Sequence, residues 1–206
     1  MANQIYLLRH GETAWSLSGQ HTGRTDLPLT ENGERRASQL RAQLQGIKFN
    51  HVLTSPLQRA RRTCELAGFG AVARADPDLQ EWDYGDYEGR TTADIHTQHP
   101  GWDVFVDGCP HGESVEKISQ RADRVVRALR LLDGTVAVFS HGQFLRTLAV
   151  RWLGLPVING RHFALDTASV SILGYEHAEH ETPAITLWNA GPDAGFTRSG
   201  PPAPAP

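Results

Sequence analysis

The sequence predicts an α/β fold, a three-layer sandwich with a mostly parallel central sheet and helices on both faces. Short apolar runs alternate along the chain with longer amphipathic segments, which is typical of such sheets. With 206 residues, the chain is long enough for one domain of this kind with a substantial core. We expect this domain to span residues 1–189. A mobile tail rich in Gly, Pro and Ala is expected at 190–206, because it has little apolar surface to bury.

The first half of the chain contains two strand signals, each followed by a helix signal. Residues 4–9 form an apolar run that predicts a strand. Residues 31–45 predict a helix whose apolar residues share one face, with Thr30 as its N-cap. Residues 52–54 predict a second, short strand. Ser55-Pro56 then offers an N-cap and a first-turn proline for the next helix.

The second half repeats the alternation and adds two late strands. Ser114 is the predicted N-cap of the longest helix. An apolar strand is expected at 135–139, followed at once by a helix that continues through about Leu153. Strands near 168–174 and 183–188 are expected to complete the sheet.

Composition excludes several classes of function and location. The net charge of -3 and the absence of a long basic run give no reason to expect a nucleic-acid partner. Cys64 and Cys109 are not spaced as a metal-binding pair, and such low cysteine usage suggests a reducing compartment. The first residues lack the features of a signal peptide, and no apolar segment is long enough to span a membrane. We therefore expect a cytoplasmic protein without a membrane partner.

The stretch Arg9-His10-Gly11 directly follows the first predicted strand. Ligand sites of α/β sheets lie at the carboxyl ends of strands. A neutral imidazole at His10 can attack phosphorus, the neighbouring Arg9 disfavours its protonation, and Gly11 allows close approach of a phosphate. A hydrogen-bonded histidine at the end of a strand is an equally good interpretation of these three residues alone.

Two further motifs carry cationic or hydrogen-bonding groups suited to an anion. Arg59 is expected in the first turn of its helix, where free backbone N–H groups and the helix dipole favour a phosphate. His141-Gly142 follows the second long apolar strand, and His141 can donate to a phosphoryl oxygen. Taken singly, a surface arginine and a helix-start histidine without a ligand remain alternatives.

The loop from Glu81 to Gly89 is dense in carboxylates and aromatic residues. One of its carboxyl groups can protonate a leaving oxygen and later activate water. Metal binding by Asp83, Asp86 and Glu88 is a rival use, although the chain lacks an evident set of spaced ligands. We expect neither a metal nor a cofactor.

In this order, the motifs resemble those of the histidine phosphatase superfamily, also called phosphoglycerate-mutase-like, from about residue 4 to residue 188. The resemblance implies His10 as phospho-acceptor and Glu81 as proton donor. It also implies that Arg9, Arg59 and His141 form the phosphate pocket.

Ser16, where most members carry asparagine, and the following loop with Thr22 and Gly23 are similar to a subgroup of the family. That subgroup contains bacterial acid phosphatases and the fungal sedoheptulose bisphosphatase, and many of its members are labelled phosphoglycerate mutase. We expect Ser16, Thr22, Gly23, Tyr84 and Gly142 to contact the substrate. A homodimer is suggested by the resemblance alone.

The sequence favours a metal-independent phosphomonoesterase that acts on a small phosphorylated metabolite or sugar phosphate. Cofactor-dependent mutases of the family have a longer, basic insertion after the Glu81 region. Here the segment 90–112 is short, and Arg90 is its only Lys or Arg. A phosphoglycerate mutase is the alternative. A phosphate-binding module without catalysis is a second one, which the full set of chemical residues argues against.

Overall fold

The computed structural model describes residues 4–176 and 182–194. Its sheet consists of β1 (Ile5–Arg9), β2 (His51–Thr54), β3 (Arg74–Ala75), β4 (Val136–Ser140), β5 (Val170–Tyr175) and β6 (Pro183–Ala190). The strand order is β3-β2-β4-β1-β5-β6. The first four of these neighbours pair in parallel, and β5 and β6 add an antiparallel edge next to β1. The predicted mostly parallel sheet is therefore confirmed.

The helices differ widely in length. The α-helices are α1 (Ala14–Ser18), α2 (Glu31–Gln43), α3 (Gln58–Leu66), α4 (Thr92–His96), α5 (Val104–Asp107), α6 (Val115–Arg130) and α7 (Gly142–Trp152). Single turns of 3-10 helix are η1 (Gly70–Val72), η2 (Pro77–Leu79), η3 (Gly85–Tyr87) and the longer η4 (Val157–His162). Among the described residues, none of these helices is long and apolar enough to cross a membrane.

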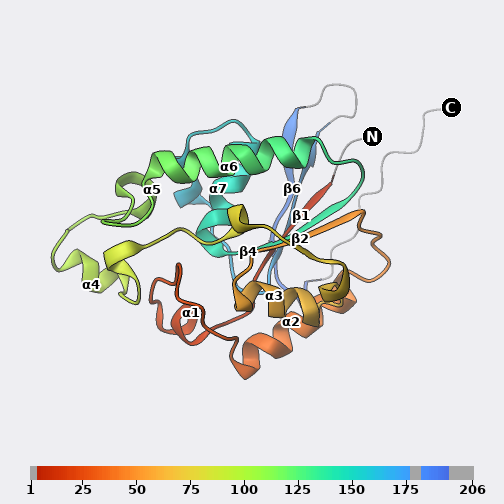
Figure 1. The fold of residues 1–206 in the computed structure, drawn as a ribbon, viewed down its shortest axis with the longest axis horizontal. Helices are drawn as coiled ribbons and strands as arrows, with labels where there is room; N and C mark the ends of the chain where they lie inside the picture. The colour runs from red at the N-terminus through yellow and green to blue at the C-terminus, as the bar shows by residue number, and fades with distance from the viewer. Residues whose placement is uncertain (1–3, 177–181, 195–206) are drawn as a thin grey trace.

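The central strand β1 is buried on both faces, as its unbroken apolar sequence requires. Ile5 and Leu7 pack in the cluster formed with α6 and α7, whereas Tyr6 and Leu8 pack in the cluster formed with α2 and α3. Figure 1 shows these two helix pairs on opposite sides of the sheet. This arrangement is the expected three-layer sandwich.

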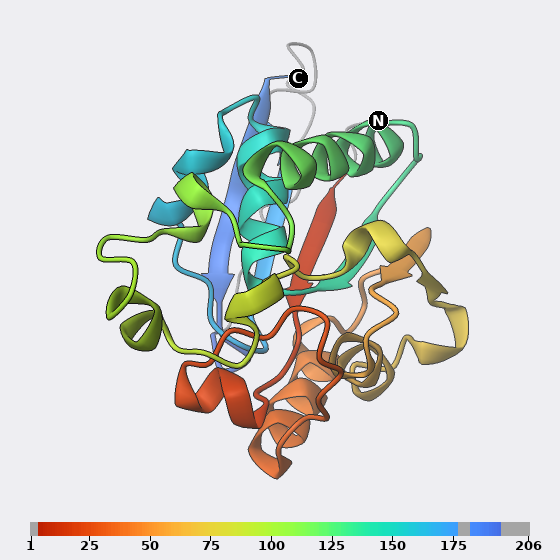
Figure 2. The same ribbon diagram turned by 60° about the vertical axis from the view of Figure 1, so that its left-hand side comes forward.

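The order of the strands brings two distant parts of the chain together at one edge of the sheet. β1 and β4 are parallel neighbours, and Arg9 is in register with Ser140. The residues that follow, His10 and His141, therefore lie side by side, with ring centroids 5.2 Å apart. In Figure 2 the carboxyl end of β1 points to the region where the loops after α1 and before η3 meet.

Helix boundaries were predicted well at two N-caps and wrongly at a third. Thr30 and Ser114 cap α2 and α6 through their side chains. The predicted cap at Ser55-Pro56 is wrong, because α3 begins at Gln58 after Leu57, which makes no side-chain cap. The Ser55 hydroxyl instead contacts His141, far along the chain, besides accepting from the Leu57 N–H.

Other differences concern short elements and ends. α2 stops at Gln43, two residues before its predicted end. The strand β3 and the short helices α1, α4 and α5 were not predicted, since segments of two to five residues carry no readable periodicity.

The start of the predicted tail is attached to the domain. Ala190 is the last residue of β6, and the Gln43 side chain donates to the carbonyls of Gly191 and Ala194 at 3.0 and 3.1 Å. The rest of the tail, 195–206, lies outside the described residues, so its mobility stays a prediction.

Candidate active site

His10 is held as a neutral imidazole with a defined tautomer. Its Nδ1 lies 2.7 Å from the Gly11 carbonyl oxygen. Because a carbonyl can only accept, Nδ1 carries the hydrogen and Nε2 keeps its lone pair. Burial, assisted by the positive charges of Arg59 and Arg9, holds the pKa of His10 well below its ordinary value. The side chain therefore presents a nucleophilic nitrogen at neutral pH.

His141 is also neutral, but both of its ring nitrogens are bonded within the protein. Nδ1 accepts from Arg59 Nε at 3.1 Å, so Nε2 carries the hydrogen and donates to the Ser55 hydroxyl at 2.8 Å. The side chain is fully buried, and burial together with the charge of Arg59 lowers the pKa of His141 well below the ordinary value. Its ring packs against that of His10, with the centroids 5.2 Å apart.

Arg59 lies in the first turn of α3, as predicted, and is completely buried. Its two Nη atoms donate to the carbonyls of Thr25 at 2.9 Å, Thr22 at 3.2 Å and Gly23 at 2.9 Å. Together with the bond to the ring of His141, these contacts tie the loop 22–25 to the centre of the site. In the structure Arg59 thus acts mainly as a clamp for this loop.

Arg9 has a donor for which the described part of the chain offers no acceptor. One Nη donates to the carbonyl of Leu165, whereas Nε is buried without a partner among the described residues. Gly142 lies against this guanidinium, since a Cβ added there would be 3.3 Å from the Arg9 Cζ and Nε. A buried cation with an unused N–H calls for an anionic ligand.

The Glu81 carboxylate is oriented by the backbone N–H of Trp82 and by two N–H groups at the start of α7. Oε1 accepts from Trp82 N and Phe144 N, both at 2.8 Å, and Oε2 accepts from Gln143 N at 3.0 Å. Oε2 therefore keeps a second lone pair, and Glu81 lines the same cavity as His10.

Behind Glu81, the buried side chain of Arg121 holds the backbone of this loop. Its guanidinium forms a two-pronged ion pair with Glu113, with Nε–Oε1 and Nη2–Oε2 distances of 2.8 and 2.6 Å. The remaining N–H groups donate to the carbonyls of Asp78 at 2.8 Å, Gln80 at 2.7 Å and Glu81 at 3.3 Å. All five donors of Arg121 have acceptors, so the loop has a rigid support.

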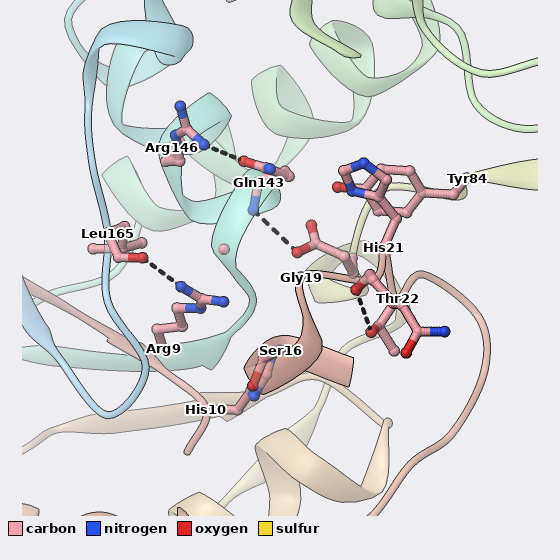
Figure 3. Close-up of a pocket in the computed structure, with 13 residues that line it drawn as sticks. Arg9, His10, Ser16, Gly19, His21, Thr22, Tyr84, Gln143, Arg146 and Leu165 are labelled. Atoms are coloured by element: carbon pink, nitrogen blue, oxygen red, sulfur yellow. Dashed lines mark hydrogen bonds between the residues drawn. The ribbon is translucent and has the colours of Figure 1, made fainter. Parts of the chain in front are cut away.

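The cavity at this edge of the sheet has a volume of about 210 Å³, enough for a phosphate and a small substituent. Figure 3 shows His10 and Arg9 at one end and Gln143 and Arg146 at the other. Its lining residues are Arg9, His10, Ser16, Gly19, Gln20, His21, Thr22, Glu81, Tyr84, Gly142, Gln143, Arg146 and Leu165.

Of the predicted substrate-binding residues, four line this cavity and one does not. Ser16, Thr22, Tyr84 and Gly142 are on its wall. Gly23 is packed beneath it, with its carbonyl on Arg59 and no room for a side chain, because a Cβ would lie 2.4 Å from the Trp82 carbonyl oxygen. Its small size is a packing requirement.

The hydroxyl of Ser16 is engaged in capping α1. It accepts from the Thr13 N–H at 2.8 Å and donates to the Thr13 carbonyl at 3.0 Å. A short side chain that is already bonded within the protein thus lies at the rim of the cavity.

Arg59 and His141 are not among the residues that line the cavity, although both were predicted to contact phosphate. The structure places them directly behind it. Conversely, the prediction missed His21, Gln143 and Arg146. Gln143 and Arg146 lie three residues apart on α7, hence on one face of the helix that begins after His141. That spacing is the signal by which they could have been found.

The carboxylates of the loop 81–89 do not converge on a common point. Asp83 lies 3.3 Å from Arg24 and Asp86 lies 2.8 Å from the ring of His111. Glu88 accepts two backbone N–H groups of the loop 22–25. Across the described residues, no group of three or more His, Cys, Asp and Glu side chains is placed to hold a metal.

Known proteins resemble this chain along most of its length. The chain is 43% identical over 190 residues to an acid phosphatase of Mycobacterium tuberculosis, covering 90% of this chain and 93% of that protein. It is 31% identical to the sedoheptulose 1,7-bisphosphatase of Saccharomyces cerevisiae, covering 90% of this chain and 92% of that protein. The solved structure of a Mycobacterium tuberculosis open reading frame product matches with a TM-score of 0.86 at 39% identity, covering 92% of this chain and 98% of that one.

The model of a single family accounts for nearly the whole described domain. It carries the description histidine phosphatase superfamily, branch 1, and matches residues 5–191. This range contains both histidines, the clamp of Arg59 and the oriented carboxylate of Glu81. The resemblance read from the motifs is thereby confirmed: the chain belongs to branch 1 of the histidine phosphatase superfamily.

Proposed function

We propose that this enzyme hydrolyses small phosphomonoesters in two steps, through a phosphohistidine formed on His10. The observation that carries the proposal is the state of this imidazole. Its Nδ1–H is bonded to the Gly11 carbonyl, its pKa is depressed, and its Nε2 lone pair is available in a cavity that Arg9 also lines. A pre-aligned neutral nucleophile next to a cation suits in-line attack on a phosphate.

In the first step, the Nε2–P bond forms while the P–O bond to the alcohol breaks. Glu81 gives its proton to the departing oxygen from Oε2, which has the spare lone-pair position. In the second step, the Glu81 carboxylate takes a proton from water, the water oxygen bonds to phosphorus, and the N–P bond breaks. His10 is regenerated and inorganic phosphate leaves.

Arg9 is assigned the direct contact with the phosphoryl oxygens, because it lines the cavity whereas Arg59 does not. Arg59 supplies positive potential from behind, and the neutral ring of His141 packs against His10. For either of them to touch the phosphate, a bond to the loop 22–25 or to Ser55 must be exchanged for one to the ligand. Direct contact between Arg59 and phosphate would therefore loosen or shift that loop, whereas contact through Arg9 leaves it in place.

Hydrolysis is favoured over mutase activity by two considerations. Relatives that cover nearly the whole chain carry the names acid phosphatase and sedoheptulose 1,7-bisphosphatase. Moreover, Arg90, the only Lys or Arg of the segment 90–112, is bonded to Gln98 and to the Asp94 carbonyl within that segment. It does not line the cavity.

The proposal is tested with p-nitrophenyl phosphate in the presence and absence of a chelator. We expect the variant His10→Ala to lose roughly 10⁴-fold or more in kcat, and the exposed Arg61→Gln to be unaffected. Wild-type enzyme quenched in alkali during turnover should carry phosphate on His10. Full activity of His10→Ala, or strict dependence on a divalent metal, would overturn the proposal.

A further inference from the structure

Arg146 is a half-buried cation that the proposed chemistry at His10 does not employ. Burial lowers the pKa of its guanidinium, but an arginine stays charged in proteins. Within residues 4–176 and 182–194, no carboxylate lies within ion-pair distance of Arg146, in contrast to Arg121 and Arg161. A partly desolvated charge without a protein counter-ion at the wall of a cavity indicates a site for an anion.

The guanidinium is fixed in place rather than free to wander. Nε donates to the Gly160 carbonyl at 2.9 Å, Nη2 to the Arg161 carbonyl at 3.1 Å and Nη1 to the Gln143 amide oxygen at 2.6 Å. The group also stacks on the ring of Phe105, 4.6 Å from its centroid. These contacts account for three of its five N–H groups, so two are left for a ligand in a pre-organised orientation.

The position of Arg146 is on the side of the leaving group. In-line displacement places the departing oxygen opposite the attacking His10, next to the proton donor Glu81. From Glu81 the contacts continue outward, first to the Gln143 N–H at 3.0 Å and then from the Gln143 amide to Arg146. Figure 3 shows Gln143 and Arg146 next to one another at the end of the cavity away from His10.

Beyond this wall there is room for the alcohol part of a substrate. A second hollow of about 450 Å³ shares His21, Gln143 and Arg146 with the catalytic cavity. Its other walls include the rings of Trp102 and Phe105. Since burial lowers the pKa of His21 to about 4, this side chain is neutral and leaves Arg146 as the cation shared by both spaces.

We propose that Arg146 determines specificity by binding a second anionic group, a carboxylate or a second phosphate, on the alcohol part of the phosphomonoester. This inference rests on the proposed hydrolysis at His10 and names the class of substrate for it. Although the segment 90–112 is poor in cations, the helix α7 supplies Arg146 to the wall of the cavity.

The experiment compares kcat/KM for matched substrates with and without the second anion. Glycerol 3-phosphate is set against 3-phosphoglycerate for a carboxylate, and fructose 6-phosphate against fructose 1,6-bisphosphate for a second phosphate. In at least one of the two pairs, we expect the wild type to prefer the substrate with the additional anionic group. The expected ratio of kcat/KM is roughly 10- to 100-fold, the range of a charge-assisted hydrogen-bonded pair. The member of the pair that shows the preference identifies the anion.

The same ratios are then measured for Arg146→Gln, Arg146→Lys and the control Arg61→Gln, which removes an exposed charge elsewhere. The preference should vanish in Arg146→Gln, survive in part in Arg146→Lys and stay intact in Arg61→Gln. A wild type without any preference, or an Arg146→Gln variant that retains it, overturns the inference. A wild type without preference overturns the inference whether or not a variant folds, and Arg146→Lys, which keeps the charge, carries the comparison if Arg146→Gln fails to fold.

Failure of the proposed hydrolysis gives results that differ from failure of the Arg146 site. If no substrate, including p-nitrophenyl phosphate, releases phosphate, hydrolysis at His10 is refuted. If 3-phosphoglycerate is converted to 2-phosphoglycerate instead of releasing phosphate, hydrolysis is replaced by transfer. In that case the loss of conversion in Arg146→Gln would still support the anion site.

Discussion

The ion pair of Arg121 and Glu113 offers a sharp test of what supports the Glu81 loop. Their side chains are only 10% and 11% exposed, and Arg121 also donates to three backbone carbonyls of residues 78–81. Arg121→Met retains the apolar stem but leaves the Glu113 carboxylate buried without a counter-ion. Removal of one partner from a buried pair costs about 3–5 kcal/mol in the free energy of unfolding.

For a protein of this length, that loss corresponds to a decrease in Tm of about 6–20 °C. Urea unfolding followed by tryptophan fluorescence measures the change, since Trp82 adjoins the loop and is fully buried. Glu113→Gln should also destabilise. The double variant should lose less than the sum of the two, because the second change removes the stranded charge left by the first.

A matched control is available one turn along the same helix. Arg124 forms a two-pronged pair with Asp78, with both bonds at 2.9 Å, but its side chain is 51% exposed. Arg124→Gln is expected to cost at most about 1 kcal/mol. If Arg121→Met destabilises no more than this control, the buried pair does not support the loop, and the argument from burial is refuted.

Two further predictions follow from the pKa shifts and from close packing. Burial lowers the pKa values of His10, His21 and His141, that of His21 to about 4. Below pH 6.5, the ordinary pKa of histidine, the unfolded chain therefore binds more protons than the folded one. The free energy of unfolding should therefore fall as the pH decreases from about 6.5 towards 4. Thermal melts between pH 7.5 and 4.5 measure the dependence of Tm on pH. His21→Gln should make this dependence less steep, and a Tm that does not change with pH would contradict the prediction. Gly23→Ala should destabilise by about 1–3 kcal/mol, because its Cβ meets the Trp82 carbonyl oxygen at 2.4 Å and the Tyr84 N at 3.0 Å, both backbone atoms. Gly191→Ala, whose nearest neighbour is an Arg36 Nη at 3.9 Å, is the control in urea unfolding, and equal effects of the two would contradict the packing argument.

The layers of the fold could be predicted from local pattern alone. A short, unbroken apolar run such as 5–8 is typical of a strand covered on both faces. The caps Thr30 and Ser114 bond to backbone only a few residues away. Ser55 shows where this reasoning stops. Its local sequence is typical of an N-cap, but its hydroxyl contacts His141, 86 residues away. The helix α3 begins later, at Gln58.

For the site, the motifs were enough to identify the chemical groups, their order and hence the family. They also placed His10 and His141 at strand ends. How the donors and charges are used could be seen only in the folded chain. Arg59 clamps a loop instead of facing the cavity, Arg9 keeps an unsatisfied N–H, and Arg146 enters the wall from α7. The physical reason is that hydrogen bonds and desolvation depend on which segments pack together, and those partners lie tens of residues apart along the chain.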